Sequence, residues 1–362
     1  MLRPLLKKTL GPILVDAGAS FDVAVVRLAQ EIAKRGTDPK RHDDVRGRKE
    51  YLERVAATYG AIDPETFFAR PPAIDHLHVA RVRELDAREP GEVLDWTWHS
   101  GWRCATPEQA EKWSRWHEND TVHVRRFRHR RKQAPAIICI HGYRAGTFSF
   151  EERAFGAQWL YGLGLDVALF TLPFHALRAP GHRRGTPLFP TADVARTNEA
   201  FGQAMWDLRR LVARLREDGA PSVGVMGMSL GGYTTSLFAT VEKDLDFAVP
   251  FIPVADLTDV VVDHEALRGV TVPPNLIEAG KRAMDLVRPL ARRPTVPAEK
   301  MMVVGAVGDR ITRTTHAECL AEHFGCELVT FQGAHLLQFG RREAFASIAK
   351  FLGRLGIIGP RR

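Results

Sequence analysis

The sequence has few cysteines and no long apolar run. Its 4 cysteines among 362 residues follow no paired spacing, which favours a reducing cytoplasm and predicts neither disulfides nor a metal site. No stretch reaches the ~18 apolar residues that a membrane helix needs. The early apolar run at 10–15 is short and contains Gly11 and Pro12, so we expect no secretory signal. These absences predict a cytoplasmic protein with no membrane span, no metal and no cofactor.

Internal repeats and long low-complexity tracts are also missing, while positive charge is in excess. The net charge of +8 and the Arg-rich segment 123–132 are typical of nucleic-acid binding. A strand with alternating outward arginines, followed by a solvated turn, explains that segment without a partner, so we predict no nucleic-acid binding. Hydrophobic residues make up 45% and charged residues 26% of the chain, which is typical of a globular protein with a full core.

The most informative motif is Gly227-Met228-Ser229-Leu230-Gly231. It ends an apolar run and opens a helix-like run through 239, which predicts a serine on a sharp turn between strand and helix. Such a turn crowds the backbone, so the positions two residues before and after the serine must be small. Gly227 and Gly231 meet this requirement, and Ser229 is our candidate nucleophile.

A serine needs a base to take its proton and an acid to orient that base. Asp309 follows the apolar run 300–307, and His335 follows a short strand at 328–331. The chain order Ser229, Asp309, His335 is the order that distinguishes one architecture of serine hydrolases from the others. Asp256, which follows the strand 247–254, is the alternative acid.

A place for developing negative charge is predicted after the apolar strand 136–140. The segment His141-Gly142-Tyr143-Arg144-Ala145-Gly146 follows directly, and its glycines allow backbone amides to turn toward a bound oxygen. We assign the oxyanion donors to the amides of Tyr143 and Leu230, because the first amides of a helix lack intrahelical partners. His141 precedes the turn and is interpreted as a structural hydrogen-bonding residue.

Apolar strands alternate with helix-like segments along most of the chain. After 136–140 we expect strands at 166–171, 222–228 and 247–254 and a long helix at 193–216, a pattern that predicts a parallel sheet. Upstream, the segments 78–84, 92–98 and 121–128 are expected to form an antiparallel edge of the same sheet. Trp96 and Trp98 would then share one face as packing residues.

Together these motifs resemble the α/β-hydrolase superfamily over about residues 120–355. The resemblance implies an α/β fold with a mostly parallel central sheet, helices on both faces, and reacting residues on loops at the carboxyl ends of strands. It does not identify a substrate, because this fold serves many reactions and includes inactive relatives.

We divide the chain into a helical N-terminal extension at 1–75 and the hydrolase domain at 76–362. The extension has helix-like stretches at 21–35 and 47–59, and it would cap the active site, cover a sheet edge or form a subunit contact. Within the domain, 256–297 resembles a lid, and its Leu276 and Ile277 would line an apolar acyl pocket or only pack helices. The loop 173–187 would bring His175 and Arg178 to an acidic substrate, or form a solvated, proline-stiffened loop.

The functional expectation is a carboxylesterase-like serine hydrolase that acts on a small ester or acyl substrate through an acyl-enzyme intermediate. An acyltransferase that uses the same residues, and a catalytically silent binding protein of the same fold, are the alternatives.

Overall fold

The computed structural model describes residues 15–16, 18–20, 22–23, 45–85, 89–130, 133–181, 187–266 and 269–359. Most of the helix expected at 21–35 lies outside the described residues. Residues 182–186 of the loop 173–187 lie outside them as well.

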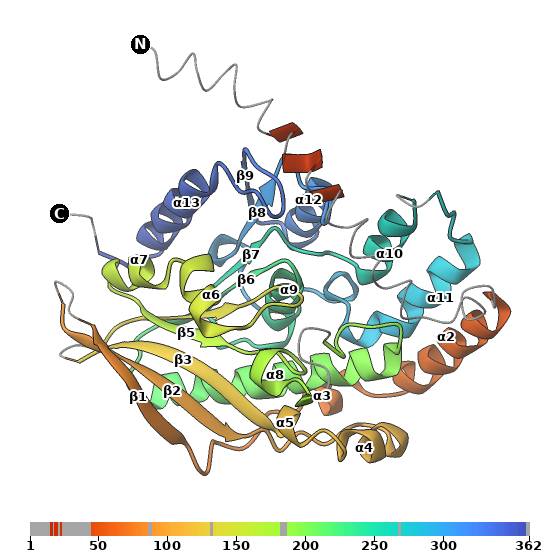
Figure 1. Ribbon diagram of the computed structural model, residues 1–362, viewed down its shortest axis with the longest axis horizontal. Coiled ribbons are helices and arrows are strands. Elements are labelled where there is room, and N and C mark those ends of the chain that lie inside the picture. Colours follow the sequence, from red (N-terminus) through yellow and green to blue (C-terminus); the bar gives the residue numbers. More distant parts are fainter. Residues whose placement is uncertain are drawn as a thin grey trace.

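One nine-stranded sheet forms the centre of the described structure, with strand order β1-β2-β3-β5-β4-β6-β7-β8-β9 (Figure 1). Strands β1 to β3 pair antiparallel with one another, β3 pairs antiparallel with β5, and the remaining neighbours run parallel. The strands are β1 His78–Leu85, β2 Gly91–His99, β3 Thr121–His129, β4 Ala136–Ile140, β5 Asp166–Phe170, β6 Val223–Met228, β7 Phe247–Phe251, β8 Met302–Ala306 and β9 Glu327–Phe331. The expected mostly parallel sheet with an antiparallel edge is confirmed.

The central strands are apolar because both of their faces are covered. Every residue of β4 to β8 is buried, as parallel strands between two helix layers require. In β4, Ile138 belongs to one hydrophobic cluster and Ile137 to the other. Successive side chains point to opposite faces, so each short strand supplies both cores.

Helices cover the two faces of the sheet. On one face lie α8 Val194–Glu217, α9 Leu230–Val241 and α12 Thr314–Phe324, and on the other lie α6 Phe148–Ala154, α7 Ala157–Gly162 and α13 Arg341–Arg354. The described residues also form the α-helices α2 Val45–Gly60, α3 Pro64–Phe67, α4 Pro107–Trp113, α5 His117–Asp120, α10 Leu257–Ala266 and α11 Pro274–Met284. In α8, Phe201, Leu208 and Leu211 are buried in the cluster on this helix's side of the sheet.

The described part of the N-terminal extension packs into the same core as the rest of the chain. Leu52, Val55 and Tyr59 of α2 belong to the hydrophobic cluster that also contains α8 and α9. The Tyr59 hydroxyl donates to the buried Glu199 carboxylate of α8 (2.9 Å), and α2 lies beside α11 at one end of the molecule (Figure 1). Helix α2 is therefore joined to the core around the sheet by apolar and polar contacts.

The basic segment of β3 is largely neutralised by carboxylates. Arg125 binds Asp95 on β2 (2.7 Å), and Arg126 binds Asp166 on β5 (2.9 Å). The expectation of outward arginines is wrong for Arg126, which is buried and lies over the Trp96 ring. Trp96 and Trp98 are both buried in one cluster, which confirms their assignment to sheet packing.

Candidate active site

Ser229 occupies the turn between β6 and α9. Its backbone angles are φ 57° and ψ −114°, which are strained for a residue with a side chain. Buried residues of β6 and α9 lie on both sides of the turn, so packing holds the strained conformation. The turn places the half-buried Ser229 beyond the carboxyl end of β6.

The glycines around Ser229 are required by close backbone contacts. A Cβ on Gly227 would lie 2.1 Å from the carbonyl oxygen of Gly231, and a Cβ on Gly231 would lie 1.9 Å from the carbonyl oxygen of Ile140. Gly232 has a similar role, since a Cβ there would lie 2.8 Å from Cα of Pro253. Glycine therefore lets α9 begin directly against the ends of β4, β6 and β7.

His335 and Asp309 form a buried hydrogen-bonded pair. Nδ1 of His335 lies 2.7 Å from Oδ2 of Asp309. The other carboxylate oxygen accepts from the amides of Ile311 (2.8 Å) and Thr312 (2.7 Å). With Nδ1 donating to the carboxylate, the Nε2 of a neutral imidazole is the nitrogen that can accept a proton.

The Thr312 hydroxyl completes the surroundings of this pair. Its Oγ1 lies 3.0 Å from Oδ2 of Asp309 and 3.2 Å from Nδ1 of His335. The hydroxyl also donates to the carbonyl oxygen of Ile252 (3.1 Å). It therefore ties the pair to the segment that follows β7.

The charge of His335 is set by opposing effects. Burial lowers the pKa of His335, whereas the Asp309 charge, the hydrogen bond to Asp309 and the Asp22 charge raise it. The attractive contributions exceed the desolvation, so the pKa lies above the ordinary value of 6.5. This environment stabilises an imidazolium, as a general base that must carry a proton requires.

Ser229 and the His335–Asp309 pair attach to neighbouring residues at one edge of the sheet. The Ser229 amide donates to the carbonyl oxygen of Phe251 (3.0 Å), and the next residue, Ile252, accepts the hydroxyl of Thr312. Strands β6, β7 and β8 are adjacent and parallel, so their carboxyl ends meet at this edge. The fold thus gathers the three residues on adjoining loops.

The loop after β4 lies next to Ser229. A Cβ on Gly142 would lie 3.5 Å from Cβ and 4.0 Å from Oγ of Ser229. Tyr143, which is exposed, follows Gly142 directly, and Leu230 is the first residue of α9, whose amide comes before the intrahelical pattern begins. The arrangement is compatible with the predicted oxyanion donors Tyr143 and Leu230.

His141 is locked into a structural role. Its Nε2 accepts a hydrogen bond from the Leu172 amide (3.0 Å), and its Nδ1 lies 2.7 Å from the carbonyl oxygen of Gly142. Burial lowers the pKa of His141 to about 4. The neutral ring therefore braces the loop after β4 against the loop after β5.

Asp256, the alternative acid, has other partners. Its Oδ1 accepts from the Thr258 amide (2.8 Å), and its Oδ2 lies 3.6 Å from Nη1 of Arg288. The Asp309 carboxylate is the one in contact with the His335 ring. The geometry therefore favours Asp309 as the orienting acid.

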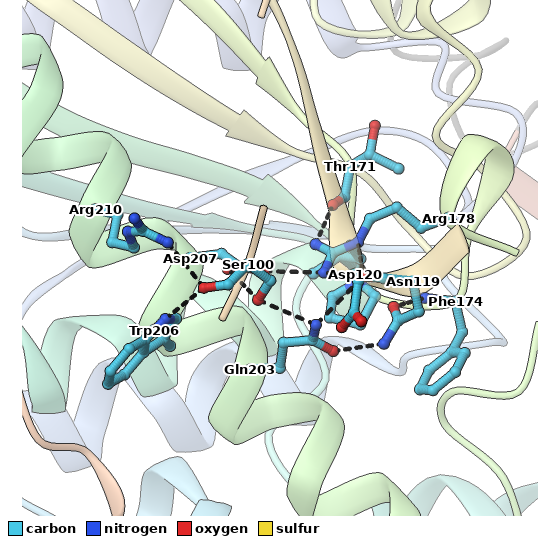
Figure 2. A network of polar contacts seen from close by, with 12 residues as sticks. Ser100, Asn119, Asp120, Thr171, Phe174, Arg178, Gln203, Trp206, Asp207 and Arg210 are labelled. Atoms are coloured by element: carbon cyan, nitrogen blue, oxygen red, sulfur yellow. Dashed lines mark hydrogen bonds and ion pairs between the residues drawn. The ribbon is translucent and has the colours of Figure 1, made fainter. Parts of the chain in front are cut away.

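Arg178 does not lie on the rim of the site, which corrects one expectation. The side chain has no exposed surface, and its guanidinium donates to Asp207 of α8 (2.9 Å), to Asn119 and to Thr171 (Figure 2). A buried guanidinium that is already paired has no means of meeting an acidic substrate. Arg178 instead fastens the loop after β5 to the body of the protein.

His175 is also fully buried rather than displayed on the rim. Its Nδ1 lies 2.8 Å from the carbonyl oxygen of Pro173, and among the described residues its Nε2 has no hydrogen-bond partner. The ring centroid lies 6.0 Å from that of Tyr143. The His175 ring therefore packs against the loop that follows β4.

In the segment 256–297, which was predicted to be a lid, α10 lies near the candidate site. His264 of α10 is close enough for the charge of His335 to lower its pKa, after the larger effect of burial. Leu276 and Ile277 of α11 are half-buried, and Leu276 packs against the main core. A substrate contact by Leu276 or Ile277 stays a prediction.

Asp22 and Thr312 were missed by the reasoning from sequence. Asp22 accepts the amides of His335 (2.8 Å) and Leu336 (3.1 Å), although 313 residues separate Asp22 from His335. No local pattern marks Asp22. Thr312 follows Asp309 by three residues, a spacing at which a backbone amide commonly donates to an Asp side chain, as the Thr312 amide does here. This spacing was an available signal.

Two further findings concern metal binding and membrane-spanning helices. Within the ranges that the structure describes, no three His, Cys, Asp or Glu side chains are grouped to bind a metal ion. None of the helices described in these ranges has the length and apolarity needed to cross a membrane.

Comparison with known proteins places this geometry in context. The family model described as "Alpha/beta hydrolase domain containing 18" matches residues 115–265. "Uncharacterized protein Rv2627c" of Mycobacterium tuberculosis is 28% identical over 322 residues, which cover 87% of this chain and 74% of that protein.

Among solved structures, the acetyl xylan esterase from Paenibacillus sp. R4 aligns with a TM-score of 0.54 at 10% identity, over 85% of this chain and 95% of that chain. Acetyl xylan esterase 1 from Thermoanaerobacterium sp. JW/SL YS485 aligns with a TM-score of 0.50 at 14% identity, over 87% of this chain and 94% of that chain. At these identities the likeness concerns the fold.

Proposed function

The chain belongs to the α/β-hydrolase superfamily, and from this premise we propose that it is a serine hydrolase of carboxylic esters. The observation that carries the proposal is the 2.7 Å bond between His335 and Asp309. This hydrogen bond joins the loops after β8 and β9, which adjoin the strained turn of Ser229. A hydroxyl, a base and an acid on neighbouring loops are the components of acyl transfer through a covalent intermediate.

In the proposed mechanism, Oγ of Ser229 attacks the ester carbonyl while Nε2 of His335 takes the hydroxyl proton. Asp309 holds the imidazole in the required tautomer and stabilises its charged form. The amides of Leu230 and Tyr143 donate to the oxyanion of the tetrahedral intermediate. When the intermediate collapses, His335 returns the proton to the departing alcohol oxygen and the acyl group stays on Ser229.

Deacylation repeats these steps with water as the nucleophile. His335 takes a proton from water as the hydroxide adds to the acyl carbonyl. When the second tetrahedral intermediate collapses, the bond between Oγ of Ser229 and the acyl carbon breaks, His335 returns the proton to Oγ, and the acid is released. Esters are the proposed substrates because alkoxides and phenolates leave more readily than amide anions. The residues in this mechanism supply all of its proton transfers, so it requires no cofactor.

The test uses chromogenic esters of graded acyl length and a fluorophosphonate probe. The wild-type protein should hydrolyse at least one ester and be labelled by the probe. Ser229→Ala should not be labelled, and its kcat should be lower by a factor of about 10⁵ to 10⁶. Asp309→Asn should lower kcat by about 10⁴, because the amide favours the wrong tautomer of His335. Asp256→Asn is the matched carboxylate control and should have a much smaller effect.

The outcomes separate the alternatives. A folded wild-type protein that resists the probe would identify a silent binding protein. Ester formation from an added alcohol, in excess over the released acid, would identify an acyltransferase. A larger loss in Asp256→Asn than in Asp309→Asn would assign the orienting role to Asp256.

A further inference from the structure

The Asp22 carboxylate is buried against the two loops that carry His335 and Asp309. Its Oδ2 accepts from the His335 amide (2.8 Å) and the Arg310 amide (3.3 Å), and its Oδ1 accepts from the Leu336 amide (3.1 Å). The residue has no exposed surface. One side chain thus bridges the residue after Asp309 and the backbone of His335 itself.

The segment around Asp22 is packed closely on the same two loops. A Cβ on Gly18 would lie 2.9 Å from Cβ of Ala334, next to His335. A Cβ on Gly308, next to Asp309, would lie 2.6 Å from Cγ1 of Val15. The absence of side chains at Gly18 and Gly308 allows this approach, which brings Asp22 within hydrogen-bonding distance.

We propose that Asp22 is a positioning residue that holds the His335 loop in register with Asp309, which makes the N-terminal segment part of the catalytic apparatus. The inference rests on the proposed function of His335 as general base. Asp22 acts on the backbone and charge of His335 and contacts no reacting atom in this proposal.

The hydrogen-bond pattern explains why a carboxylate is suited to this position. All three contacts come from backbone N–H donors, so the side chain must accept at both oxygens. An asparagine would offer one carbonyl oxygen and place an NH2 donor against an amide that also donates. Burial raises the pKa of Asp22, and the three amides oppose that shift.

Asp22 also contributes to the charge of His335. Among the described residues, the titratable groups whose charges interact with the imidazole are Asp309 after β8, Asp22 of the N-terminal segment and His264 of α10. The Asp22 charge raises the pKa of His335 in addition to the larger effect of Asp309. Removing the Asp22 charge should therefore lower the pKa of His335 and make its free base available at lower pH.

The experiment compares Asp22→Asn with Asp16→Asn in the full-length chain. Asp16 belongs to the same segment and is exposed, so it controls for the loss of a carboxylate. Asp22→Asn should lower kcat by about 10- to 100-fold, as expected for a small misplacement of a catalytic group, with KM little changed. The acidic limb of the kcat/KM profile should move to lower pH in Asp22→Asn only.

A second measurement is independent of hydrolysis. The imidazole of His335, assigned by comparison with His335→Gln, is titrated by NMR in the Ser229→Ala background with and without Asp22→Asn. A downward shift of its pKa supports the positioning role even where no ester is turned over, so failure of the proposed function is recognised separately. An unchanged pKa together with an unchanged pH profile would overturn the inference, leaving Asp22 a purely structural residue.

If Asp22→Asn does not fold, hydrogen exchange of the wild-type protein decides the question. The amides of His335 and Leu336 should exchange slowly, because both donate to the Asp22 carboxylate. Rapid exchange at both amides would contradict the inference.

Discussion

Glu151 of α6 is a buried carboxyl group beneath the candidate oxyanion loop, where it accepts the Gly146 amide (2.8 Å). Burial raises its pKa from 4.5 to about 7, against the opposing effect of that hydrogen bond. The folded protein therefore favours the protonated acid. Its contribution to stability is full below the unfolded-state pKa near 4.5 and is lost as pH rises through about 7.

Replacing Glu151 by Gln should remove this pH dependence. Gln keeps a carbonyl oxygen for the Gly146 amide but does not ionise, so the variant should gain stability over wild type as pH rises from about 4.5 to 7. The difference in the free energy of unfolding should reach about 3 kcal/mol, measured by urea denaturation across this range. A difference that is constant with pH would contradict the prediction.

Glu152 is the matched control. Burial raises its pKa, but hydrogen bonds and charges of Arg83 and Arg125 outweigh burial and lower it. Its contribution to stability is therefore present above about pH 4.5 and is lost as pH falls through the lowered pKa. Glu152→Gln should be least stable relative to wild type at neutral pH, the opposite of Glu151→Gln.

At the scale of single elements, the strand, turn and helix around Ser229 form the most constrained part of the structure. The strained backbone of Ser229 persists because α9 begins against two strand ends with no space for a side chain at Gly227 or Gly231. The backbone contacts therefore require the two glycines of the motif, and the same contacts fix the position of the serine.

Gly231→Ala should be strongly destabilising, since its Cβ would meet a backbone oxygen at 1.9 Å and β4 is buried on both faces. We expect a loss of at least about 3 kcal/mol in the free energy of unfolding, at the upper end for overpacking. Gly353→Ala is the control, because a Cβ there meets nothing within 4 Å and Gly353 lies within α13. It should be neutral or stabilising by up to about 1 kcal/mol; equal losses in the two variants would show that the contact at Gly231 is not the cause.

At the scale of the whole molecule, a buried polar network joins the antiparallel edge of the sheet to α8 and to the loop after β5. Ser100 and Arg178 both contact the Asp207 carboxylate, and Gln203 contacts Ser100 and Asn119 (Figure 2). Both members of the Arg178–Asp207 pair lack exposed surface. The network connects segments that lie more than 100 residues apart in the chain.

Replacing one member of this pair should lower the free energy of unfolding more than replacing both members. Asp207→Leu leaves the Arg178 charge buried and uncompensated, and should lower the free energy of unfolding by about 3–5 kcal/mol. The double replacement Arg178→Met with Asp207→Leu should recover most of that loss. Urea denaturation of the two single variants and the double variant forms the thermodynamic cycle, and additive losses would contradict the expected coupling.

The sequence predicted the central strands and the long helix closely, because each of these elements has a strong local pattern. The apolar run 136–140 coincides with β4, and the helix expected at 193–216 differs from α8 by one residue at each end. The short helices α4, α6 and α7 were not predicted, since each spans at most 7 residues and lacks a periodic pattern long enough to recognise. Helix α13, with 14 residues, was not predicted either.

Sequence alone determined the candidate nucleophile Ser229 and the candidate base His335, and it left Asp309 and Asp256 as candidate acids, because turn chemistry and chain order are local or sequential properties. The sequence could not distinguish a rim arginine from a buried one, and Arg178 was assigned to the wrong environment. Only the tertiary structure decided that Arg178 meets Asp207 and that Asp22 reaches the backbone of His335, 313 residues away. Burial and long-range hydrogen bonds depend on which segments the sheet order brings together, and that order is a property of the whole folded chain.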